Sequence, residues 1–335
     1  MRKSQFSGVE AFILVAAIAA ARCQTSGPVP AVAFASGNSI LLVSKTGETI
    51  STIKLPIRVG EFAFSPDLRR LVVVSLHPGD ESGGKMYLYT PESKQIQRIP
   101  AQAVSPEESR SEVYSDPQFS PDGSKLLFIA HPQAGGDLFE TSGPIAELDV
   151  KSFRARVLPS TTGSATTGPD DTDGAKLSPN GREILLWDLG IAIDTKGTIL
   201  FDLHDFQLDE SFHWASDVAW VGNSCVLYKA GKLASHYSHP YLKDQISFFV
   251  LHLKNLKSTS ASETLGLSDR QLDGLVAYRY PYALIKSAAD AAGNRGEEYF
   301  LVSSGGMRTK VAPGSAAIVQ ILPNNAKDDS PSECR

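Results

Sequence analysis

The sequence predicts an all-β fold, a β-propeller of six four-stranded blades in which the N- and C-terminal strands share one blade and close the ring. Two observations predict it. A tight turn between two short apolar runs recurs along the chain, and each such pair of runs is followed by two more that enclose a second polar turn. A four-stranded unit repeated about every 40 residues is typical of propellers.

The recurring turn has the pattern Ser-Pro-Asp/Asn, with Gly next in two copies. It occurs as FSPDL from Phe64, FSPDG from Phe119 and LSPNG from Leu177, and a degenerate copy, WVGNS, begins at Trp220. Proline presets φ for a turn, Asp and Asn bond to their own backbone, and Gly accepts a positive φ. The flanking runs are short and rich in Val, Ile, Leu and aromatic residues, so each copy predicts a β-hairpin.

The predicted blades follow one another along the chain. Five of them cover approximately residues 60–100, 114–159, 174–203, 216–264 and 271–313. The remaining blade combines three strands from residues 31–56 with a fourth from residues 316–325, which removes the sheet edges that an open ring would expose. We therefore expect one propeller domain at residues 31–325, after a signal peptide at 1–21 and a linker at 22–30 and before a tail at 326–335.

The first residues have the pattern of a secretory signal peptide. Arg2 and Lys3 precede an apolar run that ends in an Ala-x-Ala pattern at residues 19–21. The run is shorter than the roughly 20 residues that span a bilayer. The pattern predicts a periplasmic or secreted protein. Lipoprotein anchoring at Cys23 is a further alternative, although Arg22 departs from the small residues that normally precede an acylated cysteine.

Three cysteines allow at most one disulfide within the chain. Ring closure brings Cys23 and Cys334 toward the same blade, so a disulfide between these two is one alternative. Cys225 lies inside a predicted strand and is expected to be a small buried core residue.

The three Ser-Pro-Asp/Asn copies resemble the WD-like repeats of TolB-type propellers, and the resemblance covers about residues 30–325. It implies the propeller architecture. Propellers of this type include scaffold proteins, sensors, peptidase accessory domains and a few lyases, so the resemblance implies no single activity. Unlike TolB itself, this protein is expected to have no separate N-terminal domain.

Charge and motifs exclude several functions. The chain carries 37 acidic and 32 basic residues, a net charge of −5, without any block of Lys or Arg. This disfavours nucleic acid and anionic membranes as partners. The sequence has no G-x-S-x-G, H-E-x-x-H, P-loop, C-x-x-C or dinucleotide motif. We therefore predict no catalytic residue and no cofactor, and no metal ligand is assigned.

The connections between predicted strands differ between the two faces of the ring. Those between strands A and B and between C and D are short and lie on what we call the short-turn face. Those between strands B and C and between blades lie on the opposite, long-loop face, at residues 76–84, 101–113, 131–142, 159–172, 203–215, 231–244 and 287–296. Functional groups concentrate in long loops on a rigid scaffold, so the long-loop face is the candidate binding surface.

Candidate ligand-binding residues on this face are of three kinds. Imidazoles and carboxylates would suit a divalent cation or a basic ligand, and aromatic rings could stack on sugars or peptides. In the structural alternative, His-Pro is an ordinary loop dipeptide and an Asp before an inner strand bonds to backbone. The candidates are His77, His131 and His239 in His-Pro pairs, Glu61, Asp116 and Asp217 at the inner strands, and Trp214 and Tyr237 in the loops.

These features favour an exported, monomeric, non-enzymatic propeller that binds a protein or a cell-envelope component through the long-loop face. The alternative is a metal-dependent lyase or lactonase that acts on a small acidic or carbohydrate substrate. It would hold a metal over the central channel with carboxylates and some of His77, His131 and His239, and it resembles oligogalacturonate lyases in arrangement only.

Overall fold

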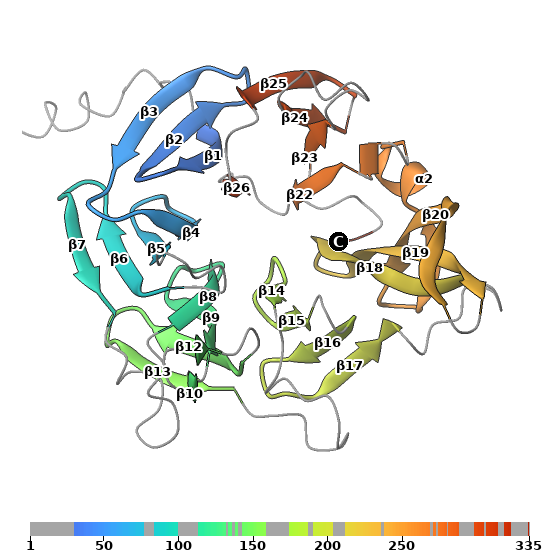
Figure 1. Ribbon diagram of the computed structural model, residues 1–335, viewed down its shortest axis with the longest axis horizontal. Coiled ribbons are helices and arrows are strands. Elements are labelled where there is room, and N and C mark those ends of the chain that lie inside the picture. Colours follow the sequence, from blue (N-terminus) through green and yellow to red (C-terminus); the bar gives the residue numbers. More distant parts are fainter. Residues whose placement is uncertain are drawn as a thin grey trace, which may run out of the picture.

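Six four-stranded antiparallel sheets are arranged around a central axis, as the repeats predict (Figure 1). The computed structural model describes residues 30–76, 84–99, 113–131, 133–135, 138–139, 143–158, 174–186, 190–203, 212–235, 238–268, 271–272, 274–279, 281–287, 298–304, 306–313, 318–322 and 334. Residues 1–29, which contain the predicted signal peptide and Cys23, lie outside the described residues.

Each blade places one strand next to the central axis and three strands progressively outward. The split blade contains β26 (Ile318–Ile321), β1 (Pro30–Ser36), β2 (Ser39–Ser44) and β3 (Thr49–Lys54). The second contains β4 (Val59–Phe64), β5 (Leu71–Ser75), β6 (Met86–Thr90) and β7 (Gln95–Arg98). The third contains β8 (Val113–Phe119), β9 (Lys125–His131), β12 (Ile145–Asp149) and β13 (Arg154–Val157).

The remaining three blades complete the ring. The fourth contains β14 (Ala175–Leu177), β15 (Glu183–Leu186), β16 (Ile191–Asp194) and β17 (Ile199–Asp202). The fifth contains β18 (Phe212–Gly222), β19 (Cys225–Ser235), β20 (Ser238–His252) and β21 (Lys257–Ser260), followed by helix α2 (Ala261–Leu265). The sixth contains β22 (Leu275–Arg279), β23 (Tyr282–Ser287), β24 (Glu298–Ser303) and β25 (Arg308–Pro313).

The ring closes through β26, the last described strand, which pairs antiparallel with β1 from Ala35↔Ile318 to Val32↔Ile321. The predicted sharing of one blade by the two ends of the propeller is confirmed. Closure gives every blade two neighbours.

The hydrophobic core is divided among the blade interfaces. The described residues form six apolar clusters, and each cluster joins side chains from two neighbouring blades. The interface at the closing seam is built like the others: Phe34 of β1 meets Tyr299 of β24 edge to face, with ring centroids 5.9 Å apart. Burial of apolar side chains between neighbouring sheets is the main force that holds adjacent blades together.

The short-turn face is built from repeated local hydrogen bonds. In the three Ser-Pro turns, the Oγ of Ser65, Ser120 and Ser178 donates to Oδ1 of the Asp or Asn two residues later, at 2.6, 2.6 and 2.8 Å. In the second turn, hydrogen bonds from the Ser120 hydroxyl and from the Ser124 N–H and hydroxyl lower the pKa of Asp122 from 3.8 to about 2. The turn residues therefore satisfy one another, as their repeated sequence predicts.

Successive Ser-Pro turns also touch one another. Arg70 Nη2 donates to the Gly123 carbonyl at 2.9 Å. A Cβ on Gly181, which has a φ of +74°, would lie 2.6 Å from Cδ of Pro121 in the preceding blade. Glycine at the end of the turn thus serves both the left-handed backbone and the close approach of two blades.

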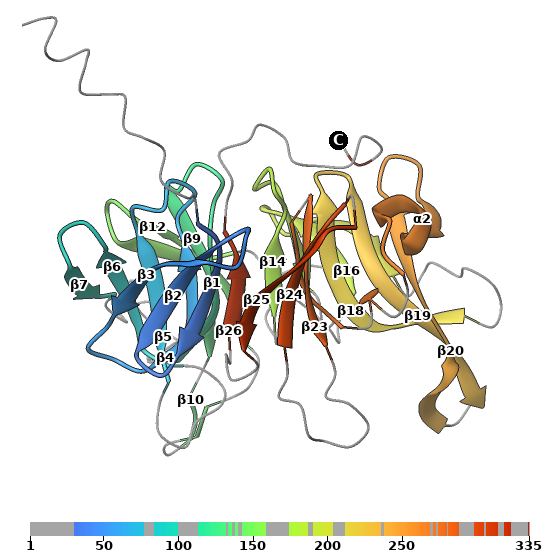
Figure 2. The same ribbon diagram turned by 90° about the horizontal axis from the view of Figure 1, so that it is seen from above.

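The long-loop face carries additional β-structure. A small hairpin of β10 (Gln133–Gly135) and β11 (Leu138–Phe139) lies between β9 and β12, and β19 and β20 extend well beyond the other strands of the ring. Figure 2 shows β10 and the end of the β19–β20 hairpin at the same edge of the ring, opposite the C-terminus.

The cysteine pairing differs from the alternative considered above. Cys334 forms a disulfide with Cys225, with Cα atoms 5.3 Å apart and 109 residues apart in sequence. Cys225 is fully buried, as expected, but it is not a free thiol. The first residue of β19 lies beside the end of the chain, and this three-dimensional proximity is not visible in the sequence.

No helix within the described ranges is both long and apolar enough to cross a membrane.

Candidate functional site

Two of the predicted acidic residues meet between the inner strands of the second and third blades. Glu61 lies on β4 and Asp116 on β8, and Glu61 Oε2 accepts a hydrogen bond from the Asp116 backbone N–H. Both side chains are half-buried. The pair is the centre of the candidate site on the described part of the long-loop side.

The backbone of β8 is bent at this point. The pairing of β8 with β9 shifts register between Ser115 and Gln118, and Asp116 has a φ of +51°. Asp is among the few residues other than Gly that enter the left-handed region with moderate frequency. A bulge of this kind redirects the side chains of a strand, which turns Asp116 toward the next blade.

Asp116 and Gln118 together hold the inner strand of the fourth blade. Asp116 Oδ2 accepts from the Ala175 N–H at 2.9 Å, and Gln118 Oε1 accepts from the Leu177 N–H at 2.8 Å. The Gln118 side-chain amide also donates to the Ala175 carbonyl. These contacts satisfy backbone groups of β14 that the sheet of its own blade leaves unpaired. In this respect Asp116 has the backbone-bonding role of the structural alternative.

A second glutamine repeats this bond between the split blade and the second blade. Gln320 Oε1 on β26 accepts from the Phe64 N–H on β4 at 3.1 Å. Gln118 and Gln320 occupy the same position of the repeat, in QFSPD and QILPN. The residues whose N–H groups donate to them, Leu177 and Phe64, are also at equivalent positions. Neither glutamine was among the predicted site residues, although their shared position in the repeat is visible in the sequence.

Burial makes Glu61 an unusual carboxyl group. Loss of solvation, and then the nearby Asp116 carboxylate, raise the pKa of Glu61 from 4.5 to about 7, while the hydrogen bond from the Asp116 N–H lowers it. Glu61 therefore exchanges a proton near neutral pH. Chemically, such a group can act as a proton acceptor or can receive a hydrogen bond from a cationic or N–H-bearing ligand.

His131 contacts Ser115, the neighbour of Asp116 in β8, and is directed into the core. It ends β9, opposite Val113, and its Nε2 lies 2.6 Å from Ser115 Oγ. Only 1% of His131 is exposed. The structure thus places His131 in the core beside the bulge, where this imidazole does not reach a ligand on the surface.

The other predicted residues are less fully described. Asp217 lies in the inner strand β18, which agrees with its predicted place at an inner strand. Trp214 also lies in β18 and His239 lies in β20, so these two residues belong to extended strands and not to the loops predicted at 203–215 and 231–244. The reason is that β19 continues pairing with β20 as far as Ser235↔Ser238. His77 and Tyr237 lie outside the described residues.

The structure therefore brings together Glu61 and Asp116, with His131 buried nearby. Within the described part of the chain, three potential metal-binding groups of His, Cys, Asp or Glu converge only at Cys225, His252 and Cys334, on the short-turn side of the fifth blade.

Neither protein-family models nor curated proteins match this chain. Among solved structures, TolB from Acinetobacter baumannii is similar, with a TM-score of 0.52 and 16% sequence identity over 87% of this chain. The fold is TolB-like. At this identity the likeness concerns the fold alone, and the chain spans 65% of the length of that TolB chain.

Two further solved structures are less similar to this TolB-like propeller. A protein of unknown function from Bacteroides caccae has a TM-score of 0.46 and 14% identity, over 87% of this chain and 98% of that one. Oligogalacturonate lyase from Vibrio parahaemolyticus has a TM-score of 0.41 and 8% identity, over 77% of this chain and 78% of that one. Neither likeness carries an argument about function.

Proposed function

We propose that this TolB-like propeller is an exported, monomeric, non-enzymatic binding protein that holds a protein or a cell-envelope component on its long-loop face. The observation that carries the proposal is the different construction of the two faces. On the short-turn face, polar groups such as Ser120 and Asp122 bond within their own turns and keep few groups for a partner. On the other face, the strands lead into the extended β19–β20 hairpin, the β10–β11 hairpin and the long connections.

Rigidity supports the same proposal. Six apolar interfaces and the side-chain bonds between inner strands fix the ends of the strands that carry the long connections. A surface presented by a rigid ring loses little conformational entropy on binding, which favours affinity.

The disulfide supports export. Disulfides persist in oxidising compartments and are rare where thiols are kept reduced. The pairing of Cys225 with Cys334 therefore agrees with the signal-peptide pattern at residues 1–21.

The lyase or lactonase alternative gains no support from the described residues. The Glu61 and Asp116 carboxylates accept hydrogen bonds from the backbone N–H groups of Asp116 and Ala175. His131 is buried against Ser115. Binding is therefore the function that the described residues support.

Site-specific photo-crosslinking tests the proposal. A photoreactive amino acid is placed at position 105 or 165, within the connections at 101–113 and 159–172 that the sequence predicts for the long-loop face. The matched controls carry it at the exposed Lys151 or Arg182 positions of the short-turn face. We expect one envelope component to crosslink from the first two positions only. The captured component is then purified and its dissociation constant measured for the wild-type chain and for a chain with residues 101–110 replaced by Gly and Ser.

Crosslinks from Lys151 or Arg182 alone would show that the wrong face was chosen. Equal affinity of the wild-type and loop-replaced chains for the purified component, with replacement of residues 160–170 also having no effect, would overturn the proposal. Fractionation of the producing cell gives a separate check, because recovery of the mature chain in the cytosol would contradict export.

A further inference from the structure

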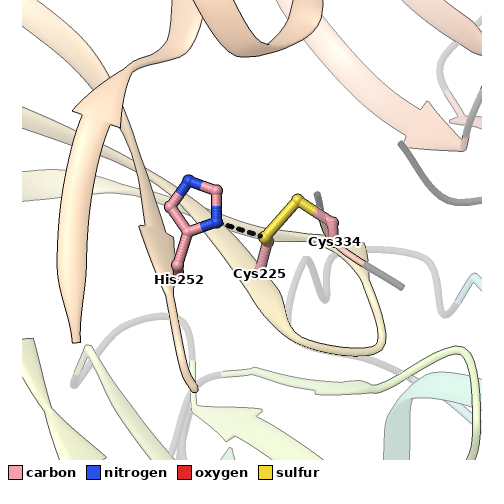
Figure 3. Close-up of side chains that lie close together, drawn as sticks. All are labelled: Cys225, His252 and Cys334. Atoms are coloured by element: carbon pink, nitrogen blue, oxygen red, sulfur yellow. Dashed lines mark hydrogen bonds between the residues drawn. A yellow bond between two sulfur atoms is a disulfide. The ribbon is translucent and has the colours of Figure 1, made fainter. Parts of the chain in front are cut away.

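A histidine lies against the disulfide in the fifth blade. Cys225 begins β19 and pairs in register with His252 at the end of β20, and Cys334 approaches from the C-terminal end of the chain (Figure 3). His252 Nδ1 is 3.4 Å from Cys225 Sγ, and the ligand atoms of the three residues all lie within 4.8 Å of one another. Both cysteines are fully buried.

A chain of hydroxyl groups fixes the tautomer of this histidine. Thr264 Oγ1, on helix α2, donates its only hydrogen to the Ser260 carbonyl at 3.2 Å, so in its contact with Thr259 Oγ1 at 2.9 Å it must accept. Thr259 therefore gives its hydrogen to Thr264 and accepts at 3.0 Å from His252 Nε2. The proton is on Nε2, and the lone pair of Nδ1 is directed at the sulfur of Cys225.

The orientation of His252 gives the disulfide no hydrogen bond. A disulfide sulfur carries no hydrogen, so the Nδ1 lone pair receives no proton from it. An imidazole whose second nitrogen donates to an oriented oxygen is, by contrast, the usual form of a metal-binding histidine, in which that outer hydrogen bond fixes the ring and raises the basicity of the ligand.

We propose that, when the disulfide is reduced, Cys225, Cys334 and His252 form a binding site for a thiophilic divalent cation such as Zn²⁺. The disulfide is then the closed, metal-free state of the same site. Reduction requires a dithiol, which transfers two electrons and two protons to the two sulfurs and itself becomes a disulfide. Zn²⁺ binding displaces the two thiol protons and leaves both sulfurs as thiolates.

The geometry suits this ion. Two sulfurs at about 2.3 Å from a tetrahedral zinc lie roughly 3.8 Å apart, a separation that rotation of the two side chains can produce while the Cα atoms stay 5.3 Å apart. Two thiolates and one neutral imidazole are a typical zinc set, and three protein ligands leave the fourth position for water or another ligand. Both cysteines belong to an apolar cluster that includes Val221, Leu227 and Val302, and this low-polarity surrounding lowers competition from water.

Titration of the purified full-length chain tests the proposal. The protein is reduced under native conditions, freed of reductant without air, and titrated with Zn²⁺ against a chromophoric chelator and with Co²⁺ by absorption. We expect one metal ion per reduced chain, none per oxidised chain, and a thiolate-to-cobalt charge-transfer band. Circular dichroism checks the fold before and after zinc addition.

Variants separate this site from adventitious binding. His252→Ala should weaken zinc binding by at least 10-fold, and Thr259→Val, which removes only the outer hydrogen bond, by about 10-fold to 100-fold. Thr52→Val, at an exposed position of β3, should have no effect. Oxidation of the reduced, zinc-loaded chain to the disulfide should release the metal.

Several results would overturn the proposal. They are a disulfide that resists reduction in the folded protein, a reduced chain that binds no stoichiometric zinc, and zinc affinity unchanged in His252→Ala. If reduction unfolds the chain, recovery of the native circular dichroism on adding Zn²⁺ would support the site, and failure to recover would count against it.

Discussion

Replacing Glu61 with glutamine should stabilise the propeller above neutral pH and leave its stability nearly unchanged around pH 4. Burial and the Asp116 carboxylate raise the pKa of Glu61 from 4.5 to about 7 in the folded chain. One pKa unit corresponds to about 1.36 kcal/mol, so ionised Glu61 lowers the free energy of unfolding by at most about 3 kcal/mol. Glutamine keeps a carbonyl oxygen that can accept from the Asp116 N–H and never acquires the charge.

The sign follows from proton uptake. Between pH 4.5 and 7 the folded chain holds a proton on Glu61 that the unfolded chain has released, so the stabilisation from this group is complete below pH 4.5 and is lost as the pH rises through 7. Other groups titrate as well. The quantity to compare is therefore the difference in stability between the two chains at each pH.

Urea unfolding of wild type and Glu61→Gln at pH 4, 5, 6, 7 and 8 measures this difference. Glu48→Gln, at an exposed position in the β2–β3 turn, is the matched control. We expect the advantage of Glu61→Gln to grow steadily up to about pH 8 and that of Glu48→Gln to stay flat. A constant difference for Glu61→Gln across the whole range would refute the reasoning.

Three other substitutions test the contacts that join the blades. Cys334→Ser opens a loop of about 100 residues and should lower the free energy of unfolding by up to about 4.7 kcal/mol, which thermal and urea melts of oxidised chains would detect. Gln118→Ala leaves backbone groups of β14 without their partner and should cost about 1–3 kcal/mol in the same melts, whereas no loss would show that water replaces the amide. Gly181→Ala should cost more than Gly37→Ala, because both have a positive φ but only Gly181 meets a neighbouring proline; equal costs would argue against that contact.

The architecture could be predicted from the sequence because each blade repeats its own local code. Proline, Asp and Gly in the Ser-Pro turns specify hairpins through interactions within a few residues, as the bonds of Ser120 and Asp122 show. The split blade was also predictable, since residues 31–56 supply three strands and the run that becomes β26 supplies the fourth.

The contacts between blades were much less accessible from the sequence. The partner of Cys334 depends on where the end of the chain meets the fifth blade, and no spacing of three cysteines encodes that position. The left-handed backbone of Asp116 and the burial of His131 result from a register shift in β8, which a list of polar residues does not reveal. Of the candidate site, the sequence predicted Glu61 and Asp116 as residues but not that they would meet each other.

The strand that closes the ring is held in two ways, by pairing with its neighbour and by a covalent link further along the chain. β26 pairs with β1 through a short ladder, and soon after it the chain is bound covalently to the fifth blade through Cys334. If β26 separates from β1, the disulfide keeps β26 tethered near its partner. A short tether corresponds to a local concentration in the millimolar range. Reclosure is then faster than pairing with β26 from another molecule at ordinary protein concentrations. The disulfide thereby protects the edge of β1 from strand exchange between chains.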